Sequence, residues 1–256
     1  MAADRDQSGS RLDQLLKQLR LSTIRQCYSQ VAEKAGKESL GYQQYLLELV
    51  ERECQVRQEN RIARLLRVSH LPLEKSLSSF DLQRLPRRLQ QQVRTLLEGS
   101  FLDRRENLLA FGNPGSGKTH LVCAIGQELV QQGRKVYFST CSLLVEQLLR
   151  AKQQLQLEWL LKKLSGFEAL VIDDLGYVQQ DRAQMEVLFT LLAQRYERGS
   201  VLLTSNLPFS KWELIFKDPM TTAAAIDRLV HHSVILELNV PSYRMEQAKN
   251  RKESVR

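Results

Sequence analysis

The stretch Gly112-Asn113-Pro114-Gly115-Ser116-Gly117-Lys118-Thr119 has the pattern G-x-x-x-x-G-K-T and lies between an apolar run and a helical pattern that ends at Gly133. Its glycines allow successive backbone N–H groups to point toward phosphate oxygens, and the amino end of the helix adds the positive end of its dipole. Lys118 is expected to reach the β- and γ-phosphates of a nucleotide, and Thr119 to offer its hydroxyl to Mg²⁺. The stretch therefore predicts a strand, a phosphate-binding loop and a helix that together bind ATP and Mg²⁺, with all eight residues in the site.

A second apolar run, Leu170-Val171-Ile172, ends in the two carboxylates Asp173 and Asp174. Charged groups at the end of a buried strand project from its carboxyl edge, which is where open α/β sheets bind ligands. Asp173 is suited to the Mg²⁺ shell, and Asp174 to orienting the attacking water as a base. Taken alone, the pattern fits a solvated strand end equally well. The phosphate-binding loop upstream favours the catalytic interpretation.

Short apolar runs rich in Val, Ile and Leu alternate with helical patterns through the rest of the chain, for example with the pattern over Met185–Tyr196. Strands and helices in alternation are typical of βαβ units. The sequence therefore predicts an α/β fold with a parallel five-stranded sheet covered by helices on both faces. The expected strands are Leu108–Phe111, Val136–Ser139, Ala169–Ile172, Val201–Thr204 and Val234–Leu238.

A different pattern occupies the first 70 residues, where apolar residues recur with helical spacing and Gly36 and Gly41 interrupt them. We predict a small all-α N-terminal domain of about three helices over residues 1–70, a linker over 71–80 and the nucleotide-binding domain, with a basic C-terminal tail, over 81–256. The first helix is predicted from Leu12, Leu15, Leu16 and Leu19, at i, i+3, i+4 and i+7.

The chain has 256 residues, of which 43% are hydrophobic and 26% charged, and a formal net charge of +8. These values exclude disordered, collagen-like and coiled-coil proteins. Residues 107–240 hold 13 Lys and Arg against 13 Asp and Glu, so the whole positive excess lies in the segments that flank them. Basic flanks around a neutral centre are expected where the flanks meet an anionic polymer, although a basic run also fits a solvated face.

No feature of the sequence predicts a membrane span or a secretory signal. The longest stretch without a charge, residues 199–210, is 12 residues long, whereas a membrane span needs about 20 apolar residues. The cysteines form no C-x-x-C pair and stand at no zinc-ligand spacing from the histidines, so free thiols in a reducing compartment are expected. We therefore expect a cytoplasmic protein without a membrane partner. The cysteines are Cys27, Cys54, Cys123 and Cys141.

Two further positions are less decisive when read from the residues alone. Thr204-Ser205-Asn206 closes an apolar strand with polar groups, which fits either the positioning of a water molecule or the start of a turn before Pro208. Arg228 projects from a predicted helix among apolar neighbours, and an isolated helical arginine is usually a surface charge.

The quoted motifs resemble, in order and spacing, the IstB family of AAA+ ATPases. The residues that carry the resemblance are GNPGSGKTHL (112–121), LVIDDLGY (170–177), LLTSNLPFSKW (202–212), AIDRLVHHS (225–233) and PSYR (241–244). Members of this family are transposition helpers encoded beside the IstA transposase in bacterial insertion sequences, and they are related to DnaC-type helicase loaders. The resemblance covers about residues 75–245, and less specifically the helical N-terminal segment.

The resemblance implies roles for several residues. Lys118 and Thr119 correspond to the Walker A pair, and Asp173 and Asp174 to the Walker B pair. Asn206, with Ser205, corresponds to sensor 1, Arg228 to an arginine finger given to a neighbouring subunit, and Arg244 to a sensor 2 candidate. The family pattern commonly has Glu where this chain has Asp174, whose shorter side chain predicts slow or assembly-dependent hydrolysis. A finger used in trans implies a homo-oligomer, either a ring or a helical filament.

Clusters of basic residues are candidates for contacts with DNA phosphates. Arg57, Arg61 and Arg64 are spaced i, i+4, i+7, which predicts a basic stripe on one helix face; a solvated face explains the stripe equally well. A second group lies between the second strand and the Walker B strand. Because no aromatic residue is interleaved with these charges, we expect contact with the duplex backbone rather than base stacking. The second group is Arg150, Lys152, Lys162 and Lys163, and a further cluster is Arg84, Arg87, Arg88 and Arg94.

The sequence thus predicts an ATP-dependent AAA+ ATPase that oligomerises on double-stranded DNA and assists an IstA-type transposase in transposition through target DNA selection. The main alternative is a DnaC-like helicase loader with the same nucleotide site. A nucleotide-binding scaffold without hydrolysis stays open because of Asp174. A small-molecule P-loop kinase would need an Arg-rich lid, and residues 107–240 contain no such segment.

Overall fold

A computed structural model describes residues 2–176, 181–216 and 218–243, and Arg244 therefore lies outside the described residues. The chain divides into two compact units, Met1–Arg64 and Leu65–Arg256, and each is described here by itself. Within the described residues, no helix combines the length and the apolar composition that crossing a membrane would need.

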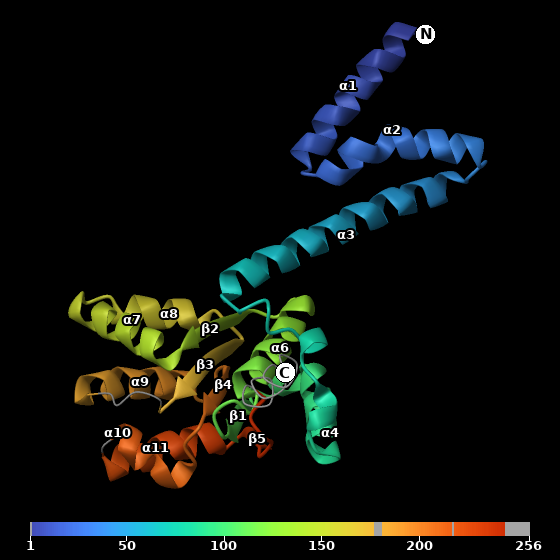
Figure 1. The fold of residues 1–256 in the computed structure, drawn as a ribbon. Helices are drawn as coiled ribbons and strands as arrows, with labels where there is room; N and C mark the ends of the chain where they lie inside the picture. The colour runs from blue at the N-terminus through green and yellow to red at the C-terminus, as the bar shows by residue number, and fades with distance from the viewer. Residues whose placement is uncertain (1, 177–180, 217, 244–256) are drawn as a thin grey trace, which may run out of the picture. The chain divides into compact units, whose positions relative to one another are not determined.

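The first unit is helical. It contains α1 (Ala2–Gln18), α2 (Ser22–Lys37) and the larger part of α3 (Tyr42–Ser69) (Figure 1). Its small core is built from Leu16, Ile24, Val31 and Leu49. The helical spacing of the leucines in α1 is confirmed, but only Leu16 of the four is buried. Several large apolar side chains of this unit are exposed: Leu12 and Leu15 on α1, Leu19 directly after it, and Tyr42, Leu46, Leu47 and Val50 on α3.

One charged side chain is buried in this unit. Glu53 of α3 is only 3% exposed, and its Oε2 accepts hydrogen bonds from the backbone N–H groups of Thr23 and Ile24 at 2.8 and 3.1 Å. These N–H groups belong to the first turn of α2, where they have no partner within the helix. Glu53 therefore joins α3 to the amino end of α2.

The second unit contains the five-stranded parallel sheet that the apolar runs predict (Figure 1), and its strand order is β2-β3-β4-β1-β5. The sheet order places β1, which carries the phosphate-binding loop, between β4 and β5. The loop therefore opens beside the carboxyl ends of neighbouring strands. The strands are β1 (Asn107–Gly112), β2 (Val136–Thr140), β3 (Ala169–Leu175), β4 (Ser200–Ser205) and β5 (Ser233–Leu238).

Helices cover both faces of this sheet, because successive side chains of each buried strand point to opposite faces. Leu108 and Ala110 of β1 pack with α4, α5 and α6, whereas Leu109 packs on the opposite face with the remaining helices. The first face is covered by α4 (Arg87–Leu97), α5 (Ser100–Asp103) and α6 (Lys118–Gln131). The second is covered by α7 (Cys141–Gln153), α8 (Leu157–Ser165), α9 (Arg182–Arg195), α10 (Glu213–Phe216) and α11 (Pro219–Val230).

The segment over residues 71–80, expected as a linker, is hydrogen bonded to α6. Gln127 donates from its side chain to the carbonyl oxygens of Pro72 and Lys75, at 2.9 and 3.1 Å. His120 Nε2 lies 2.9 Å from the carbonyl oxygen of Ser76. This segment, with the short 3₁₀ turns Leu77–Ser79 and Leu82–Arg84, therefore lies beside the phosphate-binding loop.

Candidate nucleotide-binding site

The phosphate-binding loop connects β1 to α6 and depends on glycine at its start and middle. Gly112 and Gly115 have φ values of +151° and +81°, which residues with a side chain rarely adopt. A Cβ at Gly112 would also lie 2.5 Å from the carbonyl oxygen of Leu238 in the neighbouring strand β5. The loop can therefore keep this path only with glycine at these positions.

Lys118 stands at the first position of α6 and is 6% exposed. Its Nζ donates to the carbonyl oxygens of Gly112 and Asn113 at 2.8 and 3.0 Å. The ammonium group is thus held inside the curve of the loop, where a phosphate would meet it together with the N–H groups of the helix start.

The first carboxylate of β3 is buried and oriented by the neighbouring strand. Asp173 is 4% exposed, and the hydroxyl of Thr204 on β4 donates to its Oδ1 at 2.6 Å. The same hydroxyl oxygen accepts the backbone N–H of Asp174 at 2.9 Å. One threonine thereby positions both aspartates, a role that their spacing in the sequence does not reveal.

Asp174 occupies an irregular position in the sheet. The pairing of β3 with β4 shifts between Ile172 and Leu175, and Asp174 has a φ of +59°. A bulge of this kind changes the direction of a side chain, and aspartate tolerates the left-handed region better than most residues. The side chain of Asp174 is exposed and lines the cavity above the phosphate-binding loop.

A cavity of about 500 Å³ extends over the loop. Asp174 and Asn206 line it together with Pro114–His120, so the structure brings these predicted residues to one place. Its wall also includes residues that the sequence did not single out for nucleotide binding. They are Lys75, Ser79, Phe80, Asp81, Leu85, Val240 and Tyr243. A Cβ at Gly117 would lie 3.0 Å from the Phe80 ring, and Phe80 stacks edge-to-face on His120, with ring centroids 5.2 Å apart.

Arg84 belongs to this cavity as well. Its guanidinium lies 4.9 Å from the centroid of the Tyr243 ring, and its Nη2 donates to the carbonyl oxygen of Pro241. Arg84 belongs to one of the basic clusters expected to contact DNA, whereas the structure places it in the wall of the nucleotide site. A cation in this wall would face an anionic ligand.

The donor set suits a nucleoside triphosphate with Mg²⁺. Within the described part of the chain, the hydroxyl of Ser116 is buried in the loop without a hydrogen-bond partner, as a donor awaiting an anionic ligand would be. Thr119 and Asp173 offer the oxygen ligands that Mg²⁺ prefers. The residues present therefore fit the predicted ligand and ion.

Arg228 does not line this cavity. It lies on α11, where its Nη1 donates to the carbonyl oxygen of Ala224 at 3.0 Å and its guanidinium lies 4.8 Å from the centroid of the Phe189 ring. Its position on α11, beside α9, leaves the cavity of its own subunit without this arginine.

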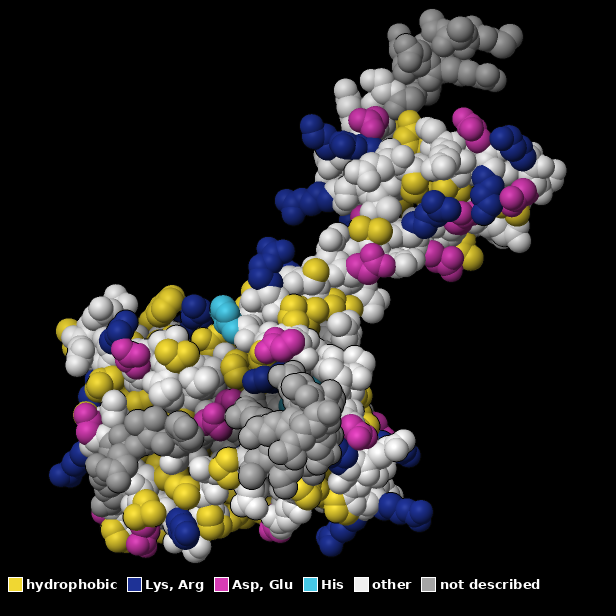
Figure 2. Space-filling model, in the orientation of Figure 1, with side chains coloured by type: hydrophobic (Ala, Val, Ile, Leu, Met, Phe, Trp, Pro, Cys, Tyr) yellow, Lys and Arg dark blue, Asp and Glu magenta, His cyan; other side chains and the backbone are white. Residues whose placement is uncertain are grey.

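The predicted DNA contacts differ in their surroundings. Arg57 forms an ion pair of 2.8 Å with the buried Glu53 and donates to the carbonyl oxygen of Arg20, so it has a structural role within the first unit. Figure 2 shows basic, acidic and apolar side chains intermixed on the visible face of this unit. Arg61 and Arg64 are exposed on the same helix.

In the second unit, Arg150 is paired with Glu146 and Lys152 with Glu186, whereas Lys162 and Lys163 are exposed on α8. Trp159 is 63% exposed on the same helix, and Lys163 Nζ lies 5.5 Å from its ring centroid. The expectation that no aromatic stands among these charges is therefore wrong for α8. Trp159 lies only three or four positions from the two lysines, so the sequence alone could have shown an aromatic residue among them.

A parallel sheet with a phosphate-binding loop after β1 and paired aspartates near the carboxyl end of β3 defines a P-loop nucleoside-triphosphate-binding protein. The chain belongs to the family described as IstB-like ATP binding protein, which matches residues 14–252. A Sinorhizobium fredii protein described as an insertion sequence ATP-binding protein is 43% identical over 244 residues, covering 95% of this chain and 82% of that protein. The corresponding protein of insertion sequence IS5376 from Geobacillus stearothermophilus is 37% identical, with coverage of 95% and 97%.

Solved structures confirm the α/β fold with its parallel sheet. The DnaC helicase loader superposes with a TM-score of 0.51 at 19% identity, over 59% of this chain and 88% of that chain. AMPPCP-bound DnaA from Aquifex aeolicus gives a TM-score of 0.55 at 18% identity, over 72% and 56%. At these identities the likeness concerns the fold alone.

Proposed function

We propose that this chain hydrolyses ATP, assembles through ATP on double-stranded DNA, and assists an IstA-type transposase in selecting target DNA. The family membership supports a place in insertion-sequence transposition, because the relatives named above are described as ATP-binding proteins of insertion sequences. The single observation that carries the ATPase proposal is the convergence of Lys118, Asp174 and Asn206 around one cavity.

In the proposed reaction, each residue acts from the position described. Lys118 neutralises charge on the β- and γ-phosphates, while Thr119 and Asp173 hold Mg²⁺. An ion held there would supply positive charge against the negative charge that develops on the phosphates. Asp174 orients the attacking water and accepts its proton, with Asn206 as a second polar contact. The shorter side chain of aspartate predicts slow turnover.

Assembly completes the site. Because Arg228 lies outside its own cavity, the nucleotide that it stabilises belongs to a neighbouring subunit, and such an arginine contributes a factor of about 10³ to 10⁵ in rate. The exposed apolar side chains of α1 and α3 in the first unit also favour contacts between chains. ATP binding would thereby strengthen a ring or filament, and hydrolysis would loosen it.

Contact with DNA is proposed for the exposed Arg61 and Arg64 of α3 and for Lys162 and Lys163 of α8. Phosphate contacts of this kind do not depend on base sequence, which suits a protein that handles many target sites. The paired Arg150 and Lys152 would have to leave their carboxylate partners to contribute.

The proposal is tested by strand transfer in vitro. The purified chain and the transposase encoded beside it are mixed with donor ends and a target plasmid, with and without ATP. We expect ATP-dependent stimulation of insertion, and no stimulation by Lys118→Ala. A matched control is Lys211→Ala, which removes an exposed lysine that does not line the cavity. Equal insertion with and without the chain would contradict the transposase part of the proposal.

A helicase loader is the second candidate, and one observation favours it. The exposed Trp159 beside Lys163 provides an aromatic platform among cations, which is typical of single-strand binding. The duplex proposal and this candidate make opposite predictions for the preferred form of DNA.

A further inference from the structure

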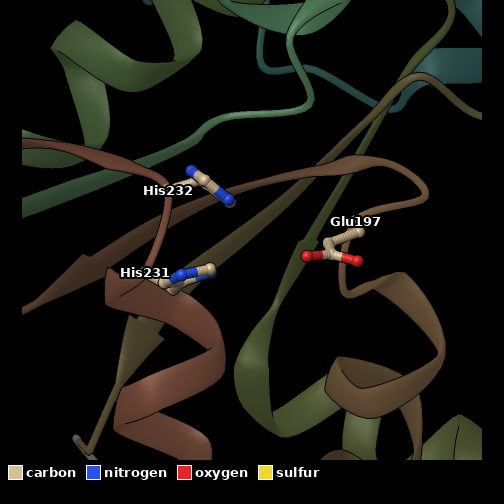
Figure 3. Close-up of side chains that lie close together, drawn as sticks. All are labelled: Glu197, His231 and His232. Atoms are coloured by element: carbon tan, nitrogen blue, oxygen red, sulfur yellow. The ribbon is translucent and has the colours of Figure 1, made fainter.

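Three side chains with metal-binding groups lie together at the edge of the sheet opposite to the nucleotide site. His231 and His232 follow the end of α11 and precede β5, while Glu197 follows the end of α9 and precedes β4. Because β4 and β5 both neighbour β1, these two turns meet at the amino ends of parallel strands. Figure 3 shows the three side chains facing the same space from the two turns.

The distances suit a shared ion. One ligand atom from each of the three exposed residues lies within 4.8 Å of the others. Zn²⁺ in tetrahedral coordination has Zn–N bonds of about 2.0–2.1 Å, so neighbouring ligand atoms lie about 3.3 Å apart. Rotation of exposed side chains closes the remaining difference without moving the backbone.

A fourth residue orients the group. The hydroxyl of Tyr196 lies 2.9 Å from His231 Nδ1. A hydrogen bond from Nδ1–H of His231 to this oxygen would leave Nε2 with its lone pair for the ion. Metal-binding histidines are oriented in this way by a partner on the other ring nitrogen.

The backbone of both turns is held by the segment before and at the start of β1. Arg105 Nη1 donates to the carbonyl oxygen of Glu197 at 2.5 Å. The backbone N–H of Asn107 donates to the carbonyl oxygen of His232 at 2.7 Å. The buried side chain of Asn107 donates to Leu229 in α11 and accepts from Val201 in β4. The two turns are therefore fixed relative to each other before any ion binds.

Local electrostatics also favour a cation. The turn with the two histidines follows the carboxyl end of α11, which carries the negative end of the helix dipole. Asp227, in the last turn of α11, interacts electrostatically with Tyr196. Glu106 interacts in the same way with His232. Arg104, Arg105 and Arg228 are the opposing charges nearby; Arg104 is paired with Glu106 at 2.9 Å, and Arg105 is engaged with a carbonyl oxygen.

We propose that Glu197, His231 and His232 form a binding site for a divalent transition-metal ion, with Zn²⁺ as the expected occupant. Two imidazoles and one carboxylate match the ligands that Zn²⁺ prefers, whereas Mg²⁺ and Ca²⁺ prefer oxygen ligands alone. Three protein ligands leave one position for water. The ion would join the end of α11 to the turn before β4.

The test is calorimetric titration of Zn²⁺ into the full chain. The chain is prepared without a polyhistidine tag, treated with a chelator, and kept in excess Mg²⁺ so that oxygen sites are occupied. Cys54, an exposed thiol, is replaced by serine throughout, since it could bind Zn²⁺ independently. We expect one Zn²⁺ per chain, and an affinity at least about 100-fold lower for His231→Ala and for His232→Ala.

Two variants distinguish a specific Zn²⁺ site from nonspecific binding of Zn²⁺ to the surface. Tyr196→Phe keeps all three ligands and removes the hydroxyl, so its affinity should fall about 10-fold, as for other partners of metal ligands. His70→Ala, which removes an exposed histidine elsewhere, should bind Zn²⁺ as the parent does. Bound Co²⁺ should give visible absorption bands that His232→Ala loses, while circular dichroism shows that the variant is folded. Absence of saturable binding by the parent, or unchanged affinity in both histidine variants, would overturn the proposal.

Discussion

The hydroxyl of Thr204 donates to Oδ1 of Asp173 across 2.6 Å and also accepts the backbone N–H of Asp174. A residue of β4 thus determines how the end of β3 presents its two carboxylates. Because Asp173 is buried, the hydrogen bond also satisfies an oxygen that would otherwise lack a partner away from water.

Replacing this threonine by its isostere should therefore affect both stability and chemistry. Thr204→Val leaves a buried carboxylate oxygen without its donor, which we expect to lower the free energy of unfolding by about 1–3 kcal/mol. It should also raise the Mg²⁺ concentration that half-maximal ATP hydrolysis requires, because Asp173 is a proposed ligand of the ion. Urea unfolding and phosphate release measure the two effects. Thr190→Val is the control, since Thr190 is exposed on α9 and bonds only within its helix; equal behaviour of the two variants would contradict the assigned role.

The second prediction concerns the proposed use of Arg228 by a neighbouring subunit. Asp174→Asn should retain ATP binding and lose hydrolysis, and Arg228→Ala should do the same because it removes the charge supplied in trans. Mixing the two variants should restore part of the activity, since some interfaces then pair an intact site with an intact arginine. Phosphate release from mixtures at constant total protein measures this restoration.

Arg198→Ala, which removes an exposed arginine near the end of α9, serves as the control and should hydrolyse ATP at the parental rate. If mixed assemblies form, as shown by cross-linking of differently labelled chains, and no activity returns, Arg228 acts only within its own subunit.

Much of the second unit follows from the sequence, because its strands are short apolar runs and its loop has a specific motif. The strand order does not follow, since adjacency of β4 to β1 and β3 is a tertiary property. The contact between Thr204 and Asp173 and the approach of Glu197 to His231 both depend on that order. The spacing of cysteines and histidines does not reveal the proposed metal site, because its third ligand is Glu197, 34 residues before His231.

In the first unit, the sequence predicts a helix but not which of its side chains are buried. Periodicity in α1 predicts a helix correctly, but it does not say how much of the apolar face the rest of the chain covers. Only Leu16 finds a buried position, while Leu19 is 66% exposed. Likewise, Arg57 looks equivalent to Arg61 and Arg64 in sequence, and only the structure shows that it pairs with Glu53.

The third prediction is a pH dependence of the first unit. Burial raises the pKa of Glu53, but the N–H groups of Ile24 and Thr23 and the guanidinium of Arg57 together lower it below the usual value. A carboxyl whose pKa is lower in the folded state contributes stability above its unfolded pKa of about 4.3, and this contribution is lost as pH falls through the folded value. Glu53→Gln should therefore be less stable at neutral pH and approach the parent in acid. Helix content followed by circular dichroism during denaturation at several pH values tests this; Glu59→Gln, an exposed control on α3, should follow the parent.

The fourth prediction concerns salt dependence. If Arg61 and Arg64 each neutralise a phosphate, replacing both by alanine should reduce the slope of log K against log salt by about 1.8 on duplex DNA, or about 0.9 per contact. Fluorescence anisotropy with two unrelated duplex sequences measures the slope, which should change equally for both. Arg57→Ala is a separate comparison, because we expect it to destabilise the first unit. An unchanged slope in the double variant would assign Arg61 and Arg64 to a solvated face.

The last prediction decides between the transposase helper and the helicase loader, and it uses the one exposed aromatic that stands among the cations of α8. Stacking of a base on an aromatic ring is worth about 1–3 kcal/mol and requires an unpaired base, whereas Lys162 and Lys163 can contact the phosphates of either form. For a protein that works on duplex target DNA, we expect ATP-dependent, cooperative binding that is tighter to duplex than to a single strand of equal length at matched salt. Trp159→Ala should then leave duplex affinity within about twofold, while replacing Lys162 and Lys163 by alanine weakens it at every sequence. A single-strand preference that Trp159→Ala abolishes would instead assign this surface to unpaired DNA and favour the loader.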